Sequence, residues 1–217
     1  MDVSAGEAAT YVARAEHCYY CCAVLDADLA HRPAPTEPPF PAVHEKISLF
    51  VSWYLYPSAR NGTPSGTPRL RGCIGTFAPQ DLVQGLAYFA RQAAFHDHRF
   101  APITAAEAPR LECSVSLLSP FEPCANYLDW MLGVHGVYIR VRDPANGREE
   151  LTATFLPEVA SAQGWSKQET IEMAMRKAGW HGPVTDATLR AVHVYRYTST
   201  KTSVTWADYV AWKGAQA

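Results

Sequence analysis

The segment KISLFVSWYLYP, residues 46–57, constrains the fold more than any other part of the chain. Apolar side chains occupy every second position, at Ile47, Leu49, Val51, Trp53 and Leu55. The intervening positions also carry aromatic side chains, at Phe50, Tyr54 and Tyr56. Because successive residues of a strand point to opposite faces, this strand is apolar on both faces and belongs in the interior of a sheet. The sequence therefore predicts a sheet-based protein with this segment as a central strand.

Helices and strands are unevenly spaced along the rest of the chain. Apolar residues at helical spacing predict helices over 11–29, 79–95, 166–180 and 206–214. Period-two alternation bounded by turn residues predicts strands near 47–56, 70–76, 111–118, 137–142, 151–155 and 189–198. Hairpin-type connections, one of them with Asn146-Gly147 at its turn, favour antiparallel pairing. Since no regular βαβ alternation occurs, we expect an α+β fold in which helices are layered on a mainly antiparallel sheet.

Helix boundaries are marked by capping residues. Asp81 stands where it would cap the second predicted helix. Ser166 and Glu169 form the spacing of a capping box, and Gly179 stands at the end of the same helix. These positions predict where two of the helices begin and one ends.

Composition limits the domain count and the class of partner. A chain of 217 residues that is 48% hydrophobic can bury a core as one domain, 1–217, with two packed lobes. Its net charge is -2 and it has no basic stripe, so we expect no nucleic-acid partner. No apolar run reaches membrane-spanning length, and the first ten residues lack the pattern of a signal peptide. Six dispersed cysteines favour free thiols in a reducing cytoplasm or nucleus.

The stretch RLRGCIGTF, residues 69–77, is the first candidate for chemistry. On a strand its residues divide into two faces, with Leu70, Gly72 and Ile74 on one and Arg71, Cys73 and Gly75 on the other. A guanidinium beside a thiol favours the thiolate, so Cys73 is a candidate nucleophile. The alternative is that Cys73 packs as a small hydrophobe in a tight strand. A phosphate-binding loop fits less well, because the lysine and Ser/Thr of a Walker motif are missing.

The glycines and the arginine of this stretch lead to further expectations. A side chain at Gly72 would fill space that a neighbouring layer needs. We expect Arg71 and Cys73 to face a groove near the GVHGV turn, residues 133–137. Because an unpaired guanidinium near a core is costly, we expect Arg71 to pair with Asp97 or Glu158.

Three other groups of residues were weighed. Cys18, Cys21 and Cys22 lie close together, but zinc would need a second ligand pair, and Cys18 and Cys22 already fall on the apolar stripe of a helix. We therefore expect no metal there. The HDHRF segment, residues 96–100, begins with His96. It fits either a helix C-terminus or the rim of a site. His135 fits either a base or a turn residue, and Glu158 either an acid or a solvated helix-start residue.

Six blocks of sequence carry a resemblance to a known family. They are LRGCIGTF (70–77), DHRF (97–100), LECSVSLL (111–118), YLDWMLGVHGV (127–137), ATFLPEVASAQGW (153–165) and RKAGW (176–180). In this order they are similar to the AMME chromosomal region candidate gene product family, of which LRGCIG is the hallmark. The HCYYCC helix and the proline-rich connector after it resemble the eukaryotic branch.

The resemblance implies a two-lobed α+β structure, a regulatory role, and a location in the nucleus and cytoplasm. In some microbes the domain is fused to a Memo-like domain and a radical SAM domain, which suggests a shared pathway without naming a reaction. The family has no established activity, so the resemblance carries no catalytic residue to this chain. The residues of the hallmark match in full, from Leu70 to Gly75.

Two classes of function therefore stay open. The first, which we favour, is a regulatory or adaptor domain that binds a protein, a peptide or a small anionic ligand in a groove around LRGCIG, without a cofactor. Its binding residues are expected to be Leu70, Arg71, Gly72, Cys73, Ile74, Gly75, Asp97, Arg99, His135 and Glu158. The second is a cysteine-dependent enzyme with Cys73 as nucleophile and His135 or His98 as base.

Overall fold

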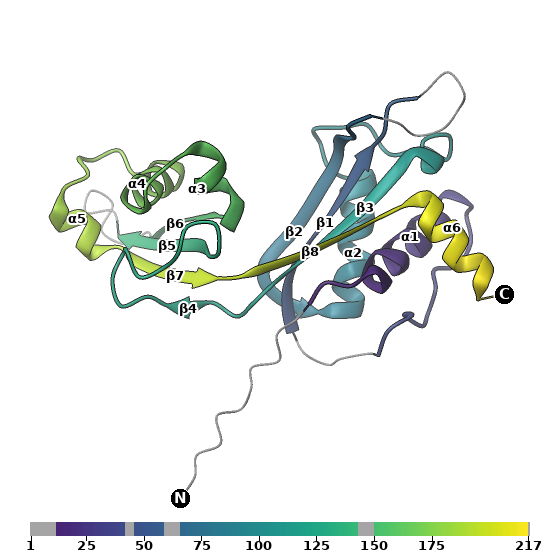
Figure 1. Ribbon diagram of the computed structural model, residues 1–217, viewed down its shortest axis with the longest axis horizontal. Helices are drawn as coiled ribbons and strands as arrows, with labels where there is room; N and C mark the ends of the chain where they lie inside the picture. Colours follow the sequence, from purple (N-terminus) through teal and green to yellow (C-terminus); the bar gives the residue numbers. More distant parts are fainter. Residues whose placement is uncertain (1–11, 42–45, 59–65, 143–149, 217) are drawn as a thin grey trace, which may run out of the picture. The chain divides into compact units, whose positions relative to one another are not determined.

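The computed structural model describes residues 12–41, 46–58, 66–142 and 150–216 of the chain (Figure 1). The chain forms two compact units. Unit 1 comprises Met1–Leu118 and Thr200–Ala217, and unit 2 comprises Ser119–Ser199. The chain passes from one unit to the other twice, after Leu118 and before Thr200. These two points give the internal boundary that the sequence did not locate. Each unit is described here by itself.

Unit 1 is a four-stranded sheet with helices on it. Its strands are β1 (Lys46–Leu55), β2 (Arg69–Asp81), β3 (Leu111–Leu118) and β8 (Ser199–Thr205), in the spatial order β2-β1-β3-β8. Its helices are α1 (Ala15–Leu29), α2 (Leu82–Phe95), the 3₁₀ turn η1 (Ala108–Arg110) and α6 (Trp206–Ala215). The central strand β1 pairs antiparallel with β2 on one side and β3 on the other, as its apolar pattern predicts.

The core of unit 1 lies between one face of this sheet and its helices. Leu49, Val51 and Trp53 of β1 are fully buried in one cluster with residues of α1 and α2. Burying a side chain of this size contributes about 1.5–3 kcal/mol to folding. The Trp53 indole donates a hydrogen bond to the Ala90 carbonyl oxygen at 3.0 Å, which leaves no polar atom of the ring unsatisfied. The side chain of Asp81 caps α2 by accepting from the Gln84 amide, as predicted.

Four cysteines meet in this core. Cys18, Cys21 and Cys22 of α1 and Cys113 of β3 have no exposed surface, and the Cys113 thiol contacts the other three. Burial raises the pKa of the Cys22 and Cys113 thiols, so these groups stay neutral and pack as hydrophobes. In the described ranges no three metal-binding side chains are arranged to hold an ion. The absence of zinc itself stays a prediction.

Unit 2 contains a second antiparallel sheet and three helices. Its strands are β4 (Glu122–Pro123), β5 (Gly136–Arg142), β6 (Glu150–Phe155) and β7 (His193–Tyr197), in the order β4-β7-β5-β6. Its helices are α3 (Pro157–Gln163), α4 (Lys167–Lys177) and α5 (Asp186–Ala191). Ile139, Ile171 and Met175 lie in the centre of its core. The predicted hairpin is present as the β5–β6 pair, and its Asn146-Gly147 turn lies outside the described residues.

Most predicted boundaries of unit 2 are confirmed, and one is wrong. The Ser166–Glu169 capping box begins α4, and Gly179 follows α4 with a φ of 98°. The predicted strand 189–198 is a helix in its first part, because the Thr185 hydroxyl accepts from the Thr188 amide and starts α5 there. The strand β7 begins only at His193.

The expected α+β class with mainly antiparallel sheets is confirmed. No helix in the part of the chain that the structure describes is both long and apolar enough to cross a membrane.

Candidate functional site

The hallmark motif lies on β2, the strand at one edge of the first sheet. Gly72 faces α2 so closely that a β-carbon there would lie 1.9 Å from the Ala93 carbonyl oxygen. Ile74 packs against the same core, and Leu70 is half-buried. The prediction that these residues face the packed side is confirmed at Gly72, where only a residue without a side chain fits, and at Ile74. It is wrong at Leu70, because a register shift at Arg71 pairs Leu70 with Tyr54, whose side chain lies on the other face of the sheet.

Cys73 points to the opposite face of the sheet. It is paired with Ser52 of β1, whose hydroxyl donates a hydrogen bond to the Cys73 sulfur at 3.0 Å. The thiol is half-buried. Close by in the strand, a β-carbon at Gly75 would lie 2.3 Å from the Leu49 carbonyl oxygen, so this position also requires glycine. Cys73 therefore belongs to a different environment from the four core cysteines.

Arg71 is saturated by contacts within unit 1. Its Nε and Nη2 donate to the two carboxylate oxygens of Glu107 at 2.8 and 3.2 Å. Its Nη1 and Nη2 donate to the carbonyl oxygens of Ala101 and Pro102 at 2.7 and 3.2 Å. The predicted pairing of Arg71 with Asp97 or Glu158 is wrong: the partner is Glu107. Because the side chain is only 10% exposed, Arg71 clamps the 101–107 segment onto the sheet edge and has little surface left for a ligand.

Asp97 and Arg99 bracket the backbone of Cys73. The Asp97 Oδ2 accepts the Cys73 amide at 2.9 Å, and the Arg99 Nη2 donates to the Cys73 carbonyl oxygen at 3.2 Å. Arg99 also donates to both oxygens of Asp97, at 2.9 and 2.7 Å. The outer side of an edge strand normally presents unpaired backbone groups, and this bracket satisfies them at Cys73.

The bracket has a marked electrostatic effect on the carboxylate. Asp97 is only 4% exposed, which by itself would favour the neutral acid. Hydrogen bonds from the Arg99 side chain, and then from the Cys73 and Arg99 amides, outweigh burial and hold the pKa of Asp97 well below its usual range. Asp97 is therefore a fixed negative charge, and its pairing with Arg99 makes the bracket neutral as a whole.

An open hollow of about 550 Å³ borders the bracket. It lies at the end of α2 and is lined by Gln92, Phe95, His96, Asp97, His98 and Phe100. The two histidines are exposed, whereas Asp97 is engaged by Arg99. The Arg99 guanidinium lies 5.4 Å from the centre of the Phe100 ring, and the Arg99 side chain is 55% exposed. The HDHRF segment thus forms both the bracket and the rim of a polar hollow.

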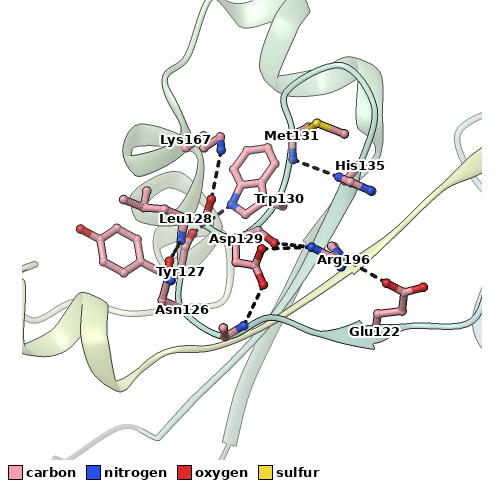
Figure 2. A network of polar contacts seen from close by, with 11 residues as sticks. Glu122, Asn126, Tyr127, Leu128, Asp129, Trp130, Met131, His135, Lys167 and Arg196 are labelled. Atoms are coloured by element: carbon pink, nitrogen blue, oxygen red, sulfur yellow. Dashed lines mark hydrogen bonds and ion pairs between the residues drawn. The ribbon is translucent and has the colours of Figure 1, made fainter.

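His135 lies in unit 2, at the end of a loop that runs from 124 to 135 (Figure 2). Its Nδ1 accepts the Met131 amide at 2.9 Å, and its own amide donates to the Met131 carbonyl oxygen. Burial, and then the charge of Arg196, lower the pKa of His135. These contacts show His135 as a residue that closes a turn. Whether it also serves Cys73 of unit 1 stays a prediction, as does the groove expected between the motif and this turn.

A polar network holds the rest of that loop in shape. The Asp129 carboxylate accepts the Ala125 amide at 3.0 Å, and Arg196 of β7 donates to the Asp129 carboxylate and backbone oxygen, both at 3.1 Å. Arg196 also pairs with Glu122, and Lys167 donates to the Leu128 carbonyl oxygen, as Figure 2 shows. Four large apolar side chains of this loop are exposed, at Leu128, Met131, Leu132 and Val134. Clustered exposed apolar groups often mark contact surfaces, and no pattern in the sequence indicated this one.

Glu158 is exposed in the first turn of α3, which is the helix-start position that the sequence offered as its plainer role. The residues that sequence reasoning missed are Glu107, Ser52, Asp129 and Arg196. Ser52 had a usable signal, because it is one of two serines, with Ser48, on a strand that is apolar at most other positions. The Arg71–Glu107 and Arg196–Asp129 contacts had none, since each joins positions far apart in the chain.

These features define a class of protein: an α+β chain with two antiparallel sheets, in which a glycine-framed edge strand is bracketed by an Asp-x-Arg loop. The AMMECR1 family model matches residues 18–202, so the chain belongs to that family. The resemblance read from the six sequence blocks is thereby confirmed.

Relatives are found in plants, yeasts and archaea. An uncharacterized protein of Arabidopsis thaliana is 39% identical over 201 residues, which are 92% of this chain and 89% of the relative. An uncharacterized protein of Schizosaccharomyces pombe is 40% identical over 195 residues, which are 90% of this chain and 94% of the relative. The crystal structure of an uncharacterized protein from Pyrococcus horikoshii matches with a TM-score of 0.62 and 25% identity, covering 85% of this chain and 87% of its own.

Proposed function

We propose that this protein is a regulatory binding domain, and that it takes up an anionic group in the hollow beside the LRGCIG motif. The observation that carries the proposal is the lining of that hollow. Two exposed imidazoles, of His96 and His98, line it together with Phe95, Phe100 and Asp97, the residue that holds the Cys73 backbone. Polar hydrogen-bonding groups among aromatic walls are typical of ligand sites.

The LRGCIG motif forms the structural support of this site. Arg71 is saturated by Glu107 and two carbonyl groups, and Gly72 is packed on α2. The groups of the DHRF segment that still reach solvent are His98 and the half-exposed Arg99, next to His96. Since Arg99 neutralises the Asp97 carboxylate, an incoming anion meets two imidazoles without an unpaired acid beside them, and the Arg99 guanidinium lies near the hollow, against the Phe100 ring.

The anionic group can belong to a free small molecule or to an acidic peptide. Two probes separate these sources: inorganic phosphate, and a blocked tetra-glutamate peptide, each titrated into the full chain at low salt. Amide NMR shifts should change at 92–100 and at Cys73, with the tighter probe identifying the source. The double variant His96→Gln/His98→Gln should weaken binding about tenfold, because it removes both imidazoles from the lining of the hollow.

His181→Gln is the matched control, since His181 is an exposed histidine of unit 2 outside the hollow. It should leave the affinity unchanged. The proposal fails if neither probe shifts the amides of 92–100 at 10 mM, or if the double variant and the control bind equally.

The second candidate is a cysteine-dependent enzyme, which the hydrogen bond from Ser52 to the half-buried Cys73 sulfur favours. Among the described residues of unit 1, however, no histidine is hydrogen-bonded to Cys73, and Arg71 is occupied by Glu107. Iodoacetamide labelling of the native protein at pH 6, followed by mass spectrometry, separates the two functions. A binding domain should label Cys73 at a rate close to that of the other half-buried thiol, Cys124. Labelling of Cys73 more than tenfold faster would support the enzyme instead.

The proposed setting is the cytoplasm or nucleus, with neither nucleic acid nor membrane as partner. The six cysteines support a reducing compartment, since all of them are free thiols in this structure. Comparison of thiol-trapped protein from intact cells with the reduced protein should show six free thiols in both.

A further inference from the structure

A second cavity lies in unit 2, away from every residue discussed as a site so far. Its volume is about 520 Å³, within the range of sites that hold small molecules. Val141 of β5, Trp180 and the two alanines of α5, Ala187 and Ala191, form its apolar lining. This cavity goes beyond the function proposed above, and it does not depend on it.

The cavity exists because α5 carries small side chains toward it. Ala187 and Ala191 stand four residues apart, on one side of the helix, and Thr188 lies beside them. The large apolar residue of this helix, Leu189, is buried in the core of the unit. A leucine in place of either alanine would occupy the cavity, so the space follows directly from the sequence of α5.

Contacts within the protein hold the aromatic wall of the cavity in place before any ligand binds. Trp180 is 5% exposed, and its indole donates to the Pro183 carbonyl oxygen at 3.4 Å. A β-carbon at Gly182 would lie 3.4 Å from the ring, which shows that this backbone packs directly on it. Arg176 of α4 donates to the carbonyl oxygens of Trp180 and Gly182, both at 2.9 Å. A ligand would therefore meet an ordered aromatic surface and need not organise it, which favours affinity.

Among the described residues, the ionisable side chains that line the cavity are basic. They are Arg142 and His193, and both are exposed. Glu150 is the cross-strand neighbour of Arg142, and its charge acts on both Arg142 and His193, but its carboxylate is hydrogen-bonded to Arg140. An apolar pocket with a guanidinium and an imidazole at its edge suits a ligand with a flat apolar body and one carboxylate.

We propose that this cavity binds an aromatic carboxylic acid, with the ring system against Trp180 and the carboxylate at Arg142 and His193. The apolar body of the ligand replaces water on the Val141, Ala187 and Ala191 surface.

The test uses the full chain and two probes of equal shape, 2-naphthoate and the neutral 2-naphthalenemethanol. NMR titration of the acid should shift the Trp180 indole N–H signal and the Thr188 amide, with the signal assigned through Trp180→Phe. The alcohol should bind at least fivefold more weakly. Arg142→Gln should weaken binding of the acid by a similar factor and leave binding of the alcohol unchanged, because only the contact with the charge is lost.

Two variants fill the cavity, Ala191→Leu and Ala187→Ile, and both positions are exposed, so the fold should tolerate at least one of them. Either variant should abolish binding of both probes. Arg190→Gln is the control, because Arg190 is an exposed arginine of α5 outside the cavity lining. The proposal is overturned if 2 mM 2-naphthoate leaves the Trp180 signal unmoved, if the alcohol binds as tightly as the acid, or if a folded cavity-filling variant still binds.

Discussion

Each unit contains an aspartate and an arginine that together hold a stretch of backbone. In unit 1, Asp97 accepts the Cys73 amide and Arg99 donates to the Cys73 carbonyl oxygen. In unit 2, Asp129 accepts the Ala125 amide and Arg196 donates to the Asp129 carboxylate. The chemical groups are the same, but the Asp97 carboxylate is 3% exposed and the Asp129 carboxylate 40%.

We expect the burial of the aspartate, and not the choice of residues, to decide what such a pair contributes to stability. In both aspartates the pKa is lowered, at Asp97 first by the Arg99 side chain and at Asp129 first by the Ala125 amide. The arginines do not differ in this direction, since Arg99 is 55% exposed and Arg196 30%. Solvent screens the exposed Asp129 carboxylate, whereas the buried Asp97 carboxylate has no water to replace a lost partner. Unit 1 should therefore depend strongly on its bracket, and unit 2 only weakly on its network.

The largest effect is expected at the glycine behind the bracket. Gly72→Ala should lower the free energy of unfolding by more than about 3 kcal/mol, because its β-carbon would collide with the Ala93 carbonyl oxygen of α2. Urea denaturation followed by circular dichroism measures this. Gly214→Ala is the control: nothing lies within 4 Å of a β-carbon there, and alanine should be neutral or slightly stabilising in α6. Equal losses for the two variants would mean that β2 does not pack on α2 as described.

The next largest effect is expected at the buried ion pair. Arg71→Met should cost about 3 kcal/mol in the same urea experiment, because it leaves the Glu107 carboxylate largely buried without its cation. Adding Glu107→Gln should restore part of that loss. The exposed Arg140–Glu150 pair of unit 2 provides the contrast, and Arg140→Met should shift the midpoint far less. A larger loss from Arg140→Met would reverse the comparison between the units.

The two aspartates test the comparison itself. Asp97→Asn should cost about 2 kcal/mol at pH 7, because the charge-assisted hydrogen bonds weaken, and Asp129→Asn should cost clearly less. The pKa of Asp97 is lower in the folded protein than in the unfolded chain, so its contribution is present above about pH 4 and is lost as the pH falls below that value. The stability difference between the wild type and Asp97→Asn should therefore shrink between pH 5 and pH 3 in urea titrations. A difference that is constant over this range would show that Asp97 is not a bracketed carboxylate.

The smallest effect is expected at His135. Burial and then Arg196 lower its pKa in the folded protein, so the unfolded chain binds a proton more readily and unit 2 loses stability as the pH falls below about 6.5. Glu122 and Asp129 oppose this shift, and Lys167 adds to it. The Met131 amide should lose hydrogen-exchange protection between pH 7 and pH 5, once corrected for intrinsic rates.

His135→Asn is the sharpest control for that experiment. The asparagine side-chain oxygen can occupy the place of Nδ1 and accept the same Met131 amide, but it does not titrate in this range. Protection at Met131 should then be independent of pH. His135→Ala should remove the protection at all pH values and cost about 1 kcal/mol. A pH-dependent Met131 amide in His135→Asn would assign the effect to another group.

Local patterns predicted most of the fold. The alternation at β1, the Asp81 cap and the Ser166–Glu169 box each depend on residues within a few positions of one another, and all are present. The prediction of a strand over 189–198 is wrong in its first part, and the cause is local as well. Thr185 and Thr188 form a capping box that starts α5 there. The split into two units involves contacts between distant segments, and no local pattern reports those.

The candidate site shows the same contrast between features set by neighbouring residues and contacts between distant segments. Alternation placed Gly72 and Cys73 on opposite faces, as the structure has them. The partner of Arg71 could not be read from the sequence, because Glu107 is one of several acids and becomes the neighbour only through the path of the 101–107 segment. Asp97 was one of the two acids expected to pair with Arg71, and it instead binds the Arg99 side chain and the Cys73 amide.

The central claim is that the DHRF segment closes the open edge of β2 at Cys73, and hydrogen exchange of the Cys73 amide tests it most directly. In the wild type this amide should be protected although it lies on the outer side of an edge strand, because it donates to Asp97. In Asp97→Ala it should exchange far faster, while the amide of Val115, in a strand with neighbours on both sides, should stay protected. A Cys73 amide that exchanges as fast in the wild type as in an unstructured peptide would contradict the account.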